Sequence, residues 1–167
     1  MTRASPFRVG QATKSAARSG GFVATITSMS TAHPVSVSIP VQWGDMDTLG
    51  HVNNARFFSW FESARIAMFQ RIGVATSRPS EVGPVLATTT CDFLRPVVFP
   101  ATVKIGVRVA RVGETSIGME YEVTDAGATA GTATVYARGT SVAVLVDYAT
   151  MQKVRVPDAV RAAIAAL

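Results

Sequence analysis

Residues 43–72 form the most informative stretch of the chain, WGDMDTLGHVNNARFFSWFESARIAMFQRI. Its second half predicts one long helix from about Asn54 to Ile72, with Gly73 as the C-terminal stop. Apolar residues recur there at helical spacing, and others widen the stripe well beyond a normal amphipathic face: Phe57, Phe61, Ala64, Met68 and Ile72, widened by Phe58, Trp60, Ile66 and Phe69. A helix that is apolar over most of its circumference is expected to be buried, with other elements wrapped around it.

Strand-like runs lie on both sides of this helix. Before it, apolar residues alternate with small or polar ones over residues 35–41, and Pro40 predicts an edge or a bulge there. After it come runs at about 85–98, interrupted by Pro96, and at 103–110, 116–123 and 132–146, with tight turns at 113–114 and 125–127. A short helix is expected from Pro157 to the C-terminus. The order predicts an α+β fold, an antiparallel sheet of about five strands around one central helix.

The composition fits one globular domain. The chain has 167 residues, of which 48% are hydrophobic, enough for a real core. One cysteine, Cys91, allows neither an internal disulfide nor a thiolate metal cage, and no apolar run approaches the roughly 20 residues of a membrane helix. We therefore expect a soluble cytoplasmic protein without a membrane partner.

The net charge of +5 comes mostly from the N-terminal segment. Residues 1–30 contain four cations and no acid, whereas the rest of the chain has 12 cations against 11 acids. We predict that residues 1–33 are a disordered or loosely ordered basic tail and that residues 34–167 are the single domain. A targeting segment and an over-extended start before Met29 are both open interpretations. Four scattered cations make a poor nucleic-acid site, so no nucleic-acid partner is expected.

A polar run before the helix carries the chemistry. Asp45, Asp47, His51, Asn53 and Asn54 fall within ten residues. A helix start presents free backbone N–H groups that suit a developing oxyanion, and a nearby carboxylate can act as nucleophile or as general base. This is a minimal acyl-transfer site. Structural roles are equally open, because either aspartate can cap a turn and either asparagine can cap the helix.

Other catalytic motifs are missing from the sequence. It has no Gly-rich phosphate loop, no nucleophile elbow and no metal-ligand spacing, and only two histidines, His33 and His51. We expect no metal.

The run Trp43 to Asn54, continued by Phe57, Phe58, Glu62 and Arg65, resembles the signature of the hotdog-fold acyl-CoA thioesterases of the 4-hydroxybenzoyl-CoA thioesterase-like family. The segment 93–97, FLRPV, is similar to a later motif of the same family. The resemblance covers about residues 35–148. It implies a hotdog fold and hydrolysis of an acyl-CoA thioester to a carboxylic acid and a thiol, with CoA part of the substrate and no other cofactor.

The resemblance also implies roles for single residues. Asp47 is the catalytic carboxylate, as nucleophile or general base, and the backbone N–H of Asn54 faces the thioester oxygen. His51 is a secondary candidate that orients water, and Asp45 is supporting. Leu49 stands where plant-type acyl-ACP thioesterases have an asparagine, so their full Asp/Asn/His set is absent.

Substrate-binding candidates are more dispersed: Trp43, Asn53, Phe58, Arg95 and Arg111. The helix aromatics can line an acyl pocket or fill the core, with the core favoured. Arg111 is the one basic residue at the hairpin where the family holds nucleotide phosphates, and Glu114 there has the opposite charge. The carrier, CoA or acyl carrier protein, is therefore open.

Three further expectations concern alternatives and partners. Glu62 is expected to pair with Arg65 at i+3 rather than act as a nucleophile. Besides an acyl-ACP thioesterase, the alternatives are a non-catalytic acyl-CoA-binding protein and, as a minor one, a hotdog hydratase. A single sheet around one apolar helix leaves a broad edge, which predicts a homodimer or homotetramer.

Overall fold

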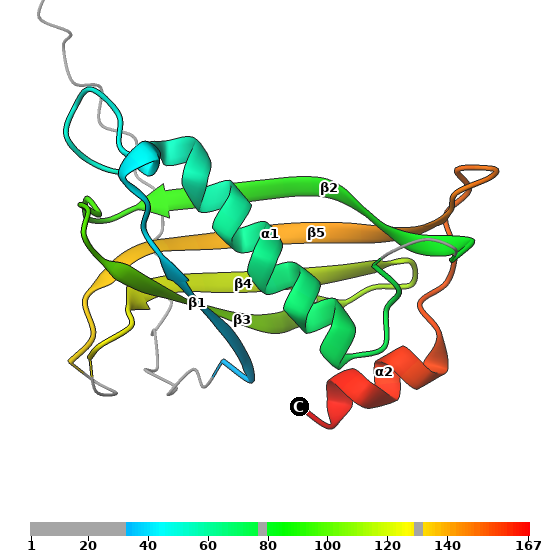
Figure 1. Cartoon of the computed structure of the whole chain (residues 1–167). Coiled ribbons are helices and arrows are strands. Elements are labelled where there is room, and N and C mark those ends of the chain that lie inside the picture. The colour runs from blue at the N-terminus through cyan, green and yellow to red at the C-terminus, as the bar shows by residue number, and fades with distance from the viewer. Residues whose placement is uncertain (1–32, 77–79, 129–131) are drawn as a thin grey trace, which may run out of the picture. The chain divides into compact units, whose positions relative to one another are not determined.

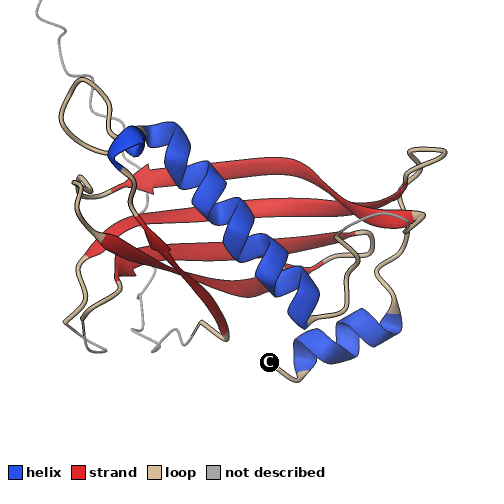
Figure 2. Ribbon diagram, in the orientation of Figure 1, coloured by secondary structure: helices blue, strands red, loops and turns tan. Residues whose placement is uncertain are grey.

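The fold is one antiparallel sheet with a long helix across one face, as Figures 1 and 2 show. The computed structural model describes residues 33–76, 80–128 and 132–167. The strands are β1 (Val35–Pro40), β2 (Val82–Phe93), β3 (Thr102–Val112), β4 (Ser116–Asp125) and β5 (Val135–Asp147), in the spatial order β1-β3-β4-β5-β2. The helices are the 3-10 turn η1 (Trp43–Asp45), α1 (Asn54–Arg71) and α2 (Asp158–Ala165). The predicted α+β hotdog fold, with five antiparallel strands, is confirmed.

Strand β1 is an edge strand, as Pro40 predicts. Among the described residues it pairs only with β3, from Val35 opposite Val107 to Pro40 opposite Thr102. Its valines and isoleucine are partly buried while Ser36 and Ser38 are exposed. A proline that cannot donate to a sheet is tolerated here because, in the part of the chain that the structure describes, one side of the strand has no neighbouring strand.

The expected boundaries of β2 are wrong at both ends. The strand begins at Val82, before Pro84, and ends at Phe93 rather than continuing to residue 98. Pro84 is accommodated because β2 is the other edge of the sheet. Beyond Phe93 the N–H groups of Leu94 and Arg95 both donate to the Tyr136 carbonyl, which turns the chain away from the β5 ladder.

Helix α1 begins and ends where the sequence predicts. Asn53 is the N-cap, and its side chain accepts a hydrogen bond from the Ala55 N–H at 2.9 Å. At the other end Gly73 has φ +76°, and the Val74 N–H reaches back to the Phe69 carbonyl at 2.9 Å. Glycine suits this left-handed position because it has no Cβ to clash.

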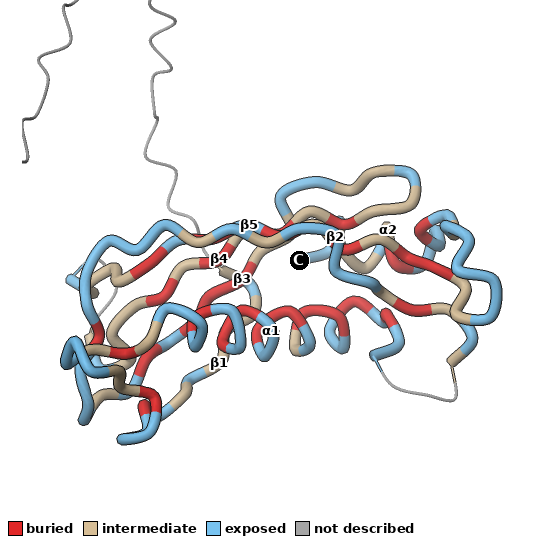
Figure 3. The backbone as a smooth tube through the Cα atoms, turned by 90° about the horizontal axis from the view of Figure 1, so that it is seen from above, coloured by how far each residue is buried: buried red, intermediate tan, exposed pale blue. Residues whose placement is uncertain are grey.

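The core lies between α1 and the sheet. Figure 3 shows buried turns of α1 on the sheet side and exposed turns on the opposite side. Phe61 is fully buried and stacks on Tyr121 of β4 with ring centroids 4.7 Å apart, and Gly139 of β5 leaves room for its ring. The wide apolar stripe is not covered all round in a single chain, because Phe58 is 36% exposed and Ile66 39%.

The C-terminal helix α2 is tied to the β3–β4 hairpin. Arg161 donates to the carbonyl oxygens of Gly113 at 2.6 Å and Glu114 at 3.2 Å. Val156 and Val160 are buried with the main core. The predicted short helix after Pro157 is confirmed, and Pro157 is its N-cap.

Residues Ala32–Leu167 form one compact unit. The prediction of a basic tail over residues 1–33 falls, apart from His33, outside the residues that the structure describes. No helix in the described part of the chain is long and apolar enough to cross a membrane.

Candidate active site

The loop between η1 and α1 is closed on itself. Met46 and Val52 form an isolated antiparallel bridge, and inside it the Asp47 N–H donates to the His51 carbonyl at 3.0 Å. The tip is a turn in which the Gly50 N–H returns to the Asp47 carbonyl at 3.1 Å, with Gly50 at φ +83°. Glycine is favoured there because a side chain would strain this backbone conformation. The loop therefore holds Asp47 at a defined place.

Asp47 has one carboxylate oxygen fixed and one free. Its Oδ1 accepts a hydrogen bond from the Leu49 N–H at 2.8 Å, which sets the side-chain orientation. Within the described residues, no donor is bonded to Oδ2. The side chain is 23% exposed, so it is sheltered but reachable. This arrangement leaves one oxygen able to attack a carbonyl or to accept a proton from water.

The start of α1 supplies a backbone N–H that is free to donate a hydrogen bond, as far as the described residues go. Asn54 is the first helical residue, and its backbone N–H has no hydrogen-bond acceptor among the described residues. The N–H groups of Ala55 and Arg56 are already used by the Asn53 side chain and carbonyl. An unpaired N–H at the positive end of an 18-residue helix suits a negative carbonyl oxygen.

His51 lies beside Asp47 without a direct hydrogen bond to it. Its Nδ1 is 3.9 Å from Asp47 Oδ1 and donates instead to the Val52 carbonyl at 3.3 Å. That bond requires the proton on Nδ1 and leaves Nε2 as an acceptor. A bound water could therefore be oriented by Nε2.

Asp45 holds the loop rather than facing the cavity. Its Oδ2 accepts from the Gln42 N–H at 2.9 Å, and its Oδ1 lies 3.0 Å from Arg56 Nε in the first turn of α1. Its backbone carbonyl also accepts from the Asn53 N–H at 2.8 Å. These contacts agree with the supporting role that the sequence resemblance implies for it.

A cavity of about 540 Å³ opens beside these groups. One wall is the loop and helix start, and the other is the segment after β2, joined to the loop by the hydrogen bond from Val52 N–H to the Val97 carbonyl at 2.8 Å. Residues from both walls line it: Asp47, Leu49, His51, Val52, Asn54, Phe57, Phe93, Leu94, Arg95, Pro96 and Val97. Asp47, Asn54, His51 and Arg95, all predicted from the sequence, are thus brought together.

The apolar wall was not predicted as such. Phe57 and Phe93 meet edge to face with centroids 5.1 Å apart, at the junction of α1 and the end of β2. The signals for this wall in the sequence are the FLRPV motif and the helix aromatics, for which a place in an acyl pocket was one of two open interpretations. The sequence alone does not show this contact between two distant segments, because the contact depends on the order of the strands in the sheet.

Four other predicted substrate residues lie outside this cavity. Trp43 is 75% exposed and packs edge to face on Phe99, 5.9 Å between centroids. Asn53 is the helix cap. Phe58 lies on the uncovered side of α1, and Arg111 is exposed next to the β3–β4 hairpin, at the opposite end of β3 from Thr102. Within one chain none of these four therefore lines the cavity beside Asp47.

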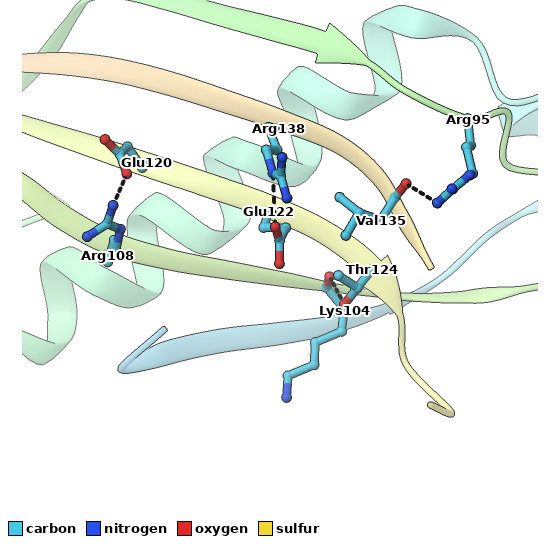
Figure 4. A network of polar contacts seen from close by, with 8 residues as sticks. All are labelled: Arg95, Lys104, Arg108, Glu120, Glu122, Thr124, Val135 and Arg138. Atoms are coloured by element: carbon cyan, nitrogen blue, oxygen red, sulfur yellow. Dashed lines mark hydrogen bonds and ion pairs between the residues drawn. The ribbon is translucent and has the colours of Figure 1, made fainter. Parts of the chain in front are cut away.

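The cations of the sheet's outer face are mostly paired, as Figure 4 shows. Arg108 pairs with Glu120, and Arg138 Nε lies 3.0 Å from Glu122 Oε2. Arg95 stands apart at the cavity wall and donates to the Val135 carbonyl at 3.4 Å. Of the strand and loop cations considered from the sequence, Arg95 is therefore the one that lines the cavity beside Asp47.

The expected pair between Glu62 and Arg65 does not form. In the described part of the chain no carboxylate lies within 4.0 Å of Arg65, which instead donates to the Tyr121 hydroxyl at 3.5 Å. Arg65 is drawn beneath α1 toward β4, whereas Glu62 is exposed. Helical spacing alone cannot show that one side chain of such a pair points inward.

Neither a thiol nor a metal cluster competes with this site. Burial and the neighbouring Asp92 raise the pKa of Cys91 to about 11, so its thiol stays protonated at neutral pH. The described residues contain no group of three or more histidine, cysteine or carboxylate side chains that could hold a metal ion.

Comparison with known proteins identifies the family. The model of the thioesterase-like superfamily matches residues 41–164. The chain belongs to this superfamily. Among the similar solved structures is the PA2801 protein of Pseudomonas aeruginosa, which is 37% identical to this chain. The match has a TM-score of 0.70 and covers 78% of this chain and 97% of PA2801. A thioesterase of Thermus thermophilus, solved in complex with coenzyme A and Zn, is 36% identical with a TM-score of 0.66. This match covers 80% of this chain and 98% of that one.

A curated relative matches a shorter part of this thioesterase-like chain. The uncharacterized protein YsmA of Bacillus subtilis is 33% identical over 83 residues, which are 50% of this chain and 56% of YsmA. The chain thus matches little more than half the length of that relative.

Proposed function

We propose that the chain hydrolyses acyl-CoA thioesters to a carboxylic acid and free CoA. One observation carries this proposal: Asp47 and Asn54, whose backbone N–H has no acceptor among the described residues, line the same cavity at the start of α1. These are the two groups that acyl transfer needs, a base or nucleophile and an oxyanion donor. Membership of the thioesterase-like superfamily supports the same reaction.

In the proposed reaction the thioester carbonyl oxygen accepts the Asn54 N–H. In one route the free oxygen of Asp47 attacks the carbonyl carbon, and the carbon–sulfur bond breaks to give an acyl-aspartyl anhydride, which water then hydrolyses. In the other route the same oxygen takes a proton from a water that attacks the carbonyl carbon, and the carbon–sulfur bond breaks as the tetrahedral intermediate collapses to the acid. In both routes the thiolate leaves and takes up a proton. His51 Nε2 orients the water.

CoA is the proposed carrier. Arg95 is the cation placed at the cavity to meet CoA phosphates, and the relative from Thermus thermophilus solved with coenzyme A supports this choice. The Asp47 carboxylate argues against a purely binding protein, because a carboxylate beside a thioester adds nothing to binding. A cytoplasmic location and the absence of a further cofactor stay predictions.

A thiol-release assay over a panel of acyl-CoAs tests the activity. Asp47→Asn should lower kcat by about 10²-fold or more, since it removes the base or nucleophile but keeps the shape. Asp92→Asn is the matched control, because Asp92 is exposed and does not line the cavity. Equal activity in the wild type and Asp47→Asn would refute the assignment, and inactivity of the wild type on every thioester would favour the binding alternative. A parallel acyl-ACP panel distinguishes the carrier.

A single turnover in heavy-oxygen water separates the two roles of Asp47. A nucleophilic carboxylate gains label, because water attacks the anhydride and can leave its oxygen on the aspartate. A general base gains none. Mass spectrometry of the peptide that contains Asp47 reads the result directly.

We also propose that the chain forms a homodimer through β2. In the described residues β2 pairs only with β5, so its other edge is open. Leu86 and Phe93 of β2 and Phe58 and Ile66 of α1 are exposed near that edge. A second copy would satisfy the strand and cover these side chains. Light scattering after size exclusion should show a dimer that Leu86→Lys dissociates and that the control Val98→Lys does not; a monomeric wild type would contradict this.

A further inference from the structure

Trp43, the first residue of η1, is held in place while most of its ring stays exposed. It is 75% exposed, and its ring meets the Phe99 ring at an interplanar angle of 84°. The Met46 N–H donates to the Trp43 carbonyl at 3.2 Å, and the Phe99 N–H donates to Met46 Sδ at 3.4 Å. With three quarters of the residue exposed, a broad face of the indole is free for a planar ligand.

Arg56 in the first turn of α1 is half-exposed and is anchored through one nitrogen. Its Nε lies 3.0 Å from Asp45 Oδ1, and among the described residues Asp45 is the one carboxylate within 4.0 Å of it. Asp45 itself is 8% exposed and uses its other oxygen for the Gln42 N–H. The carboxylate therefore orients the Arg56 guanidinium, whose terminal N–H groups face away from Nε and can donate to a second anion.

Trp43 and Arg56 are fixed to the same short turn of backbone. Trp43 and Asp45 are the first and last residues of η1, so their Cα atoms lie only about 4–6 Å apart. Asp45 in turn holds Arg56 through its carboxylate and the Asn53 N–H through its backbone carbonyl. The fold thus presents an exposed aromatic ring and an oriented cation on one well-held turn.

Neither side chain lies on the surface that the proposed homodimer would cover. Trp43 follows β1, and β1 and β2 are opposite edges of the sheet. Arg56 and Phe58 are two positions apart on α1, which places them about 200° apart around the helix axis. The exposure of Trp43 and Arg56 is therefore kept when β2 pairs with a second copy.

The pair lies beside the cavity at Asp47 and not within it. Neither Trp43 nor Arg56 lines the cavity, but each adjoins one of its walls. Phe99, which touches Trp43, comes two residues after Val97 of the second wall, and Arg56 comes two residues after Asn54 of the first. CoA is an extended molecule in which the pantetheine arm separates the thioester from the nucleotide. When the thioester lies in the cavity, the nucleotide therefore lies on the surface next to it.

We propose that Trp43 and Arg56 bind the nucleotide end of CoA, with the adenine ring on the indole and the ribose 3′-phosphate on the Arg56 guanidinium. The inference rests on the proposed function, because the thioester end of the same molecule lies at Asp47. Aromatic side chains stack on nucleic-acid bases, and the arginine fork binds phosphate with parallel hydrogen bonds. CoA also carries a diphosphate, which leaves Arg95 at the cavity wall a phosphate of its own.

Binding of adenosine 3′,5′-bisphosphate tests the proposal without any turnover. The chain has two tryptophans, and Trp60 is only 4% exposed, so quenching of the exposed indole reports stacking at Trp43. The nucleotide should quench the fluorescence saturably, whereas ribose 5-phosphate, which has no base, should not. Trp43→Ala should remove the quenching and weaken binding at least about fivefold in calorimetry. Quenching that persists in Trp43→Ala would overturn the proposal.

Arg56→Met should weaken binding of adenosine 3′,5′-bisphosphate at least about tenfold and binding of adenosine 5′-monophosphate much less. The ratio of the two affinities cancels any general loosening of η1 in this variant. Arg111→Met is the matched control, because it removes the same charge from the exposed hairpin end of β3 and should leave the ratio unchanged. A ratio that falls in Arg111→Met but not in Arg56→Met would place the nucleotide at the hairpin and overturn the proposal.

Two further outcomes separate this inference from the proposed function. Acyl-CoA hydrolysis with a KM that neither Trp43→Ala nor Arg56→Met raises would overturn the nucleotide site while the thioesterase assignment stands. Nucleotide binding that depends on both residues, in a chain that hydrolyses no thioester, would refute the thioesterase assignment alone. An indole at Trp43 that acrylamide cannot quench in the free protein would show that this surface is covered in solution, which would also overturn the inference.

Discussion

The Arg56 side chain lies 3.0 Å from the Asp45 carboxylate, which ties the first turn of α1 to the loop before it. Asp45 is buried and also accepts the Gln42 N–H, so one carboxylate joins three parts of the site. These contacts therefore hold the loop and the helix start together. This link positions Asp47 relative to Asn54 although neither residue belongs to it.

Asp45→Ala should lower both stability and activity. The substitution leaves the Gln42 N–H without its acceptor. The free energy of unfolding, measured in urea, should therefore fall by about 1–3 kcal/mol. The value of kcat should fall at a temperature where the variant is still folded, because the loop is released from α1. Arg56→Met is the control, which breaks only the ion pair and should cost less than about 1 kcal/mol. Full activity in folded Asp45→Ala would contradict the positioning role.

Gly139→Ala should destabilise the protein by about 1–3 kcal/mol through overpacking. A Cβ at this position would collide with the Phe61 ring and approach the Thr90 carbonyl. Phe61→Leu should relieve part of the clash, so the double variant should lose less stability than the two single losses added together. Gly127→Ala is the control, since its nearest neighbour would be at 3.6 Å. If the stability loss of the double variant equalled the sum of the two single losses, the Phe61 ring would not be the group that clashes with the added Cβ.

Arg161→Ala should cost about 1–3 kcal/mol of unfolding free energy, because two hairpin carbonyls lose a charged donor. Arg155→Ala removes only an exposed pair with Asp158 and should cost less than about 1 kcal/mol. Hydrogen exchange should rise first at the hairpin amides in Arg161→Ala. If the two variants lost equal amounts of unfolding free energy, the Arg161 hydrogen bonds would not be what holds α2 to the hairpin.

His33 should make the folded state less stable in mild acid. Burial lowers its pKa in the folded state, an effect that Glu122 opposes and Arg108 reinforces. Above about pH 6.5 the histidine is neutral in both states, and it contributes no pH dependence. Below that pH the unfolded chain takes up a proton that the folded chain resists, so stability falls as pH falls through the window from about 6.5 to the folded pKa.

Urea unfolding at pH 8 and pH 5.5 measures this effect. His33→Gln should lose less stability between the two pH values than the wild type does. Identical losses would show that His33 does not carry the pH dependence. Titration of the His33 ring by NMR gives an independent check.

The sequence predicted those features that depend on residues close together along the chain. A cap at Asn53 or Asn54, the stop at Gly73 and the alternation in β4 were all readable, because each depends on residues a few positions apart. Asp47 and Asn54 followed from a long family motif. The failures are at long range: the end of β2 depends on the Tyr136 carbonyl, and the inward turn of Arg65 depends on Tyr121.

The site residues divide in the same way. Arg95 was predicted and reaches the cavity, whereas Arg111 was predicted from a hairpin position that lies at the far end of β3. Phe93 and Leu94 line the cavity only because β2 and α1 lie side by side there. Spacing along the chain could not give this contact.

The closed loop from Met46 to Val52 and the segment after β2 give the cavity two walls of independent origin. The proposed reacting groups, Asp47 and Asn54, belong to the loop and the helix start that follows it, and four apolar lining residues belong to the second wall: Phe93, Leu94, Pro96 and Val97. Substitutions at Phe93, Leu94 or Pro96 can therefore reshape the space for an acyl group without moving Asp47 or Asn54. If the proposed function holds, substitutions in the second wall can change the preferred acyl group, in nature or in the laboratory, while the catalytic groups stay the same.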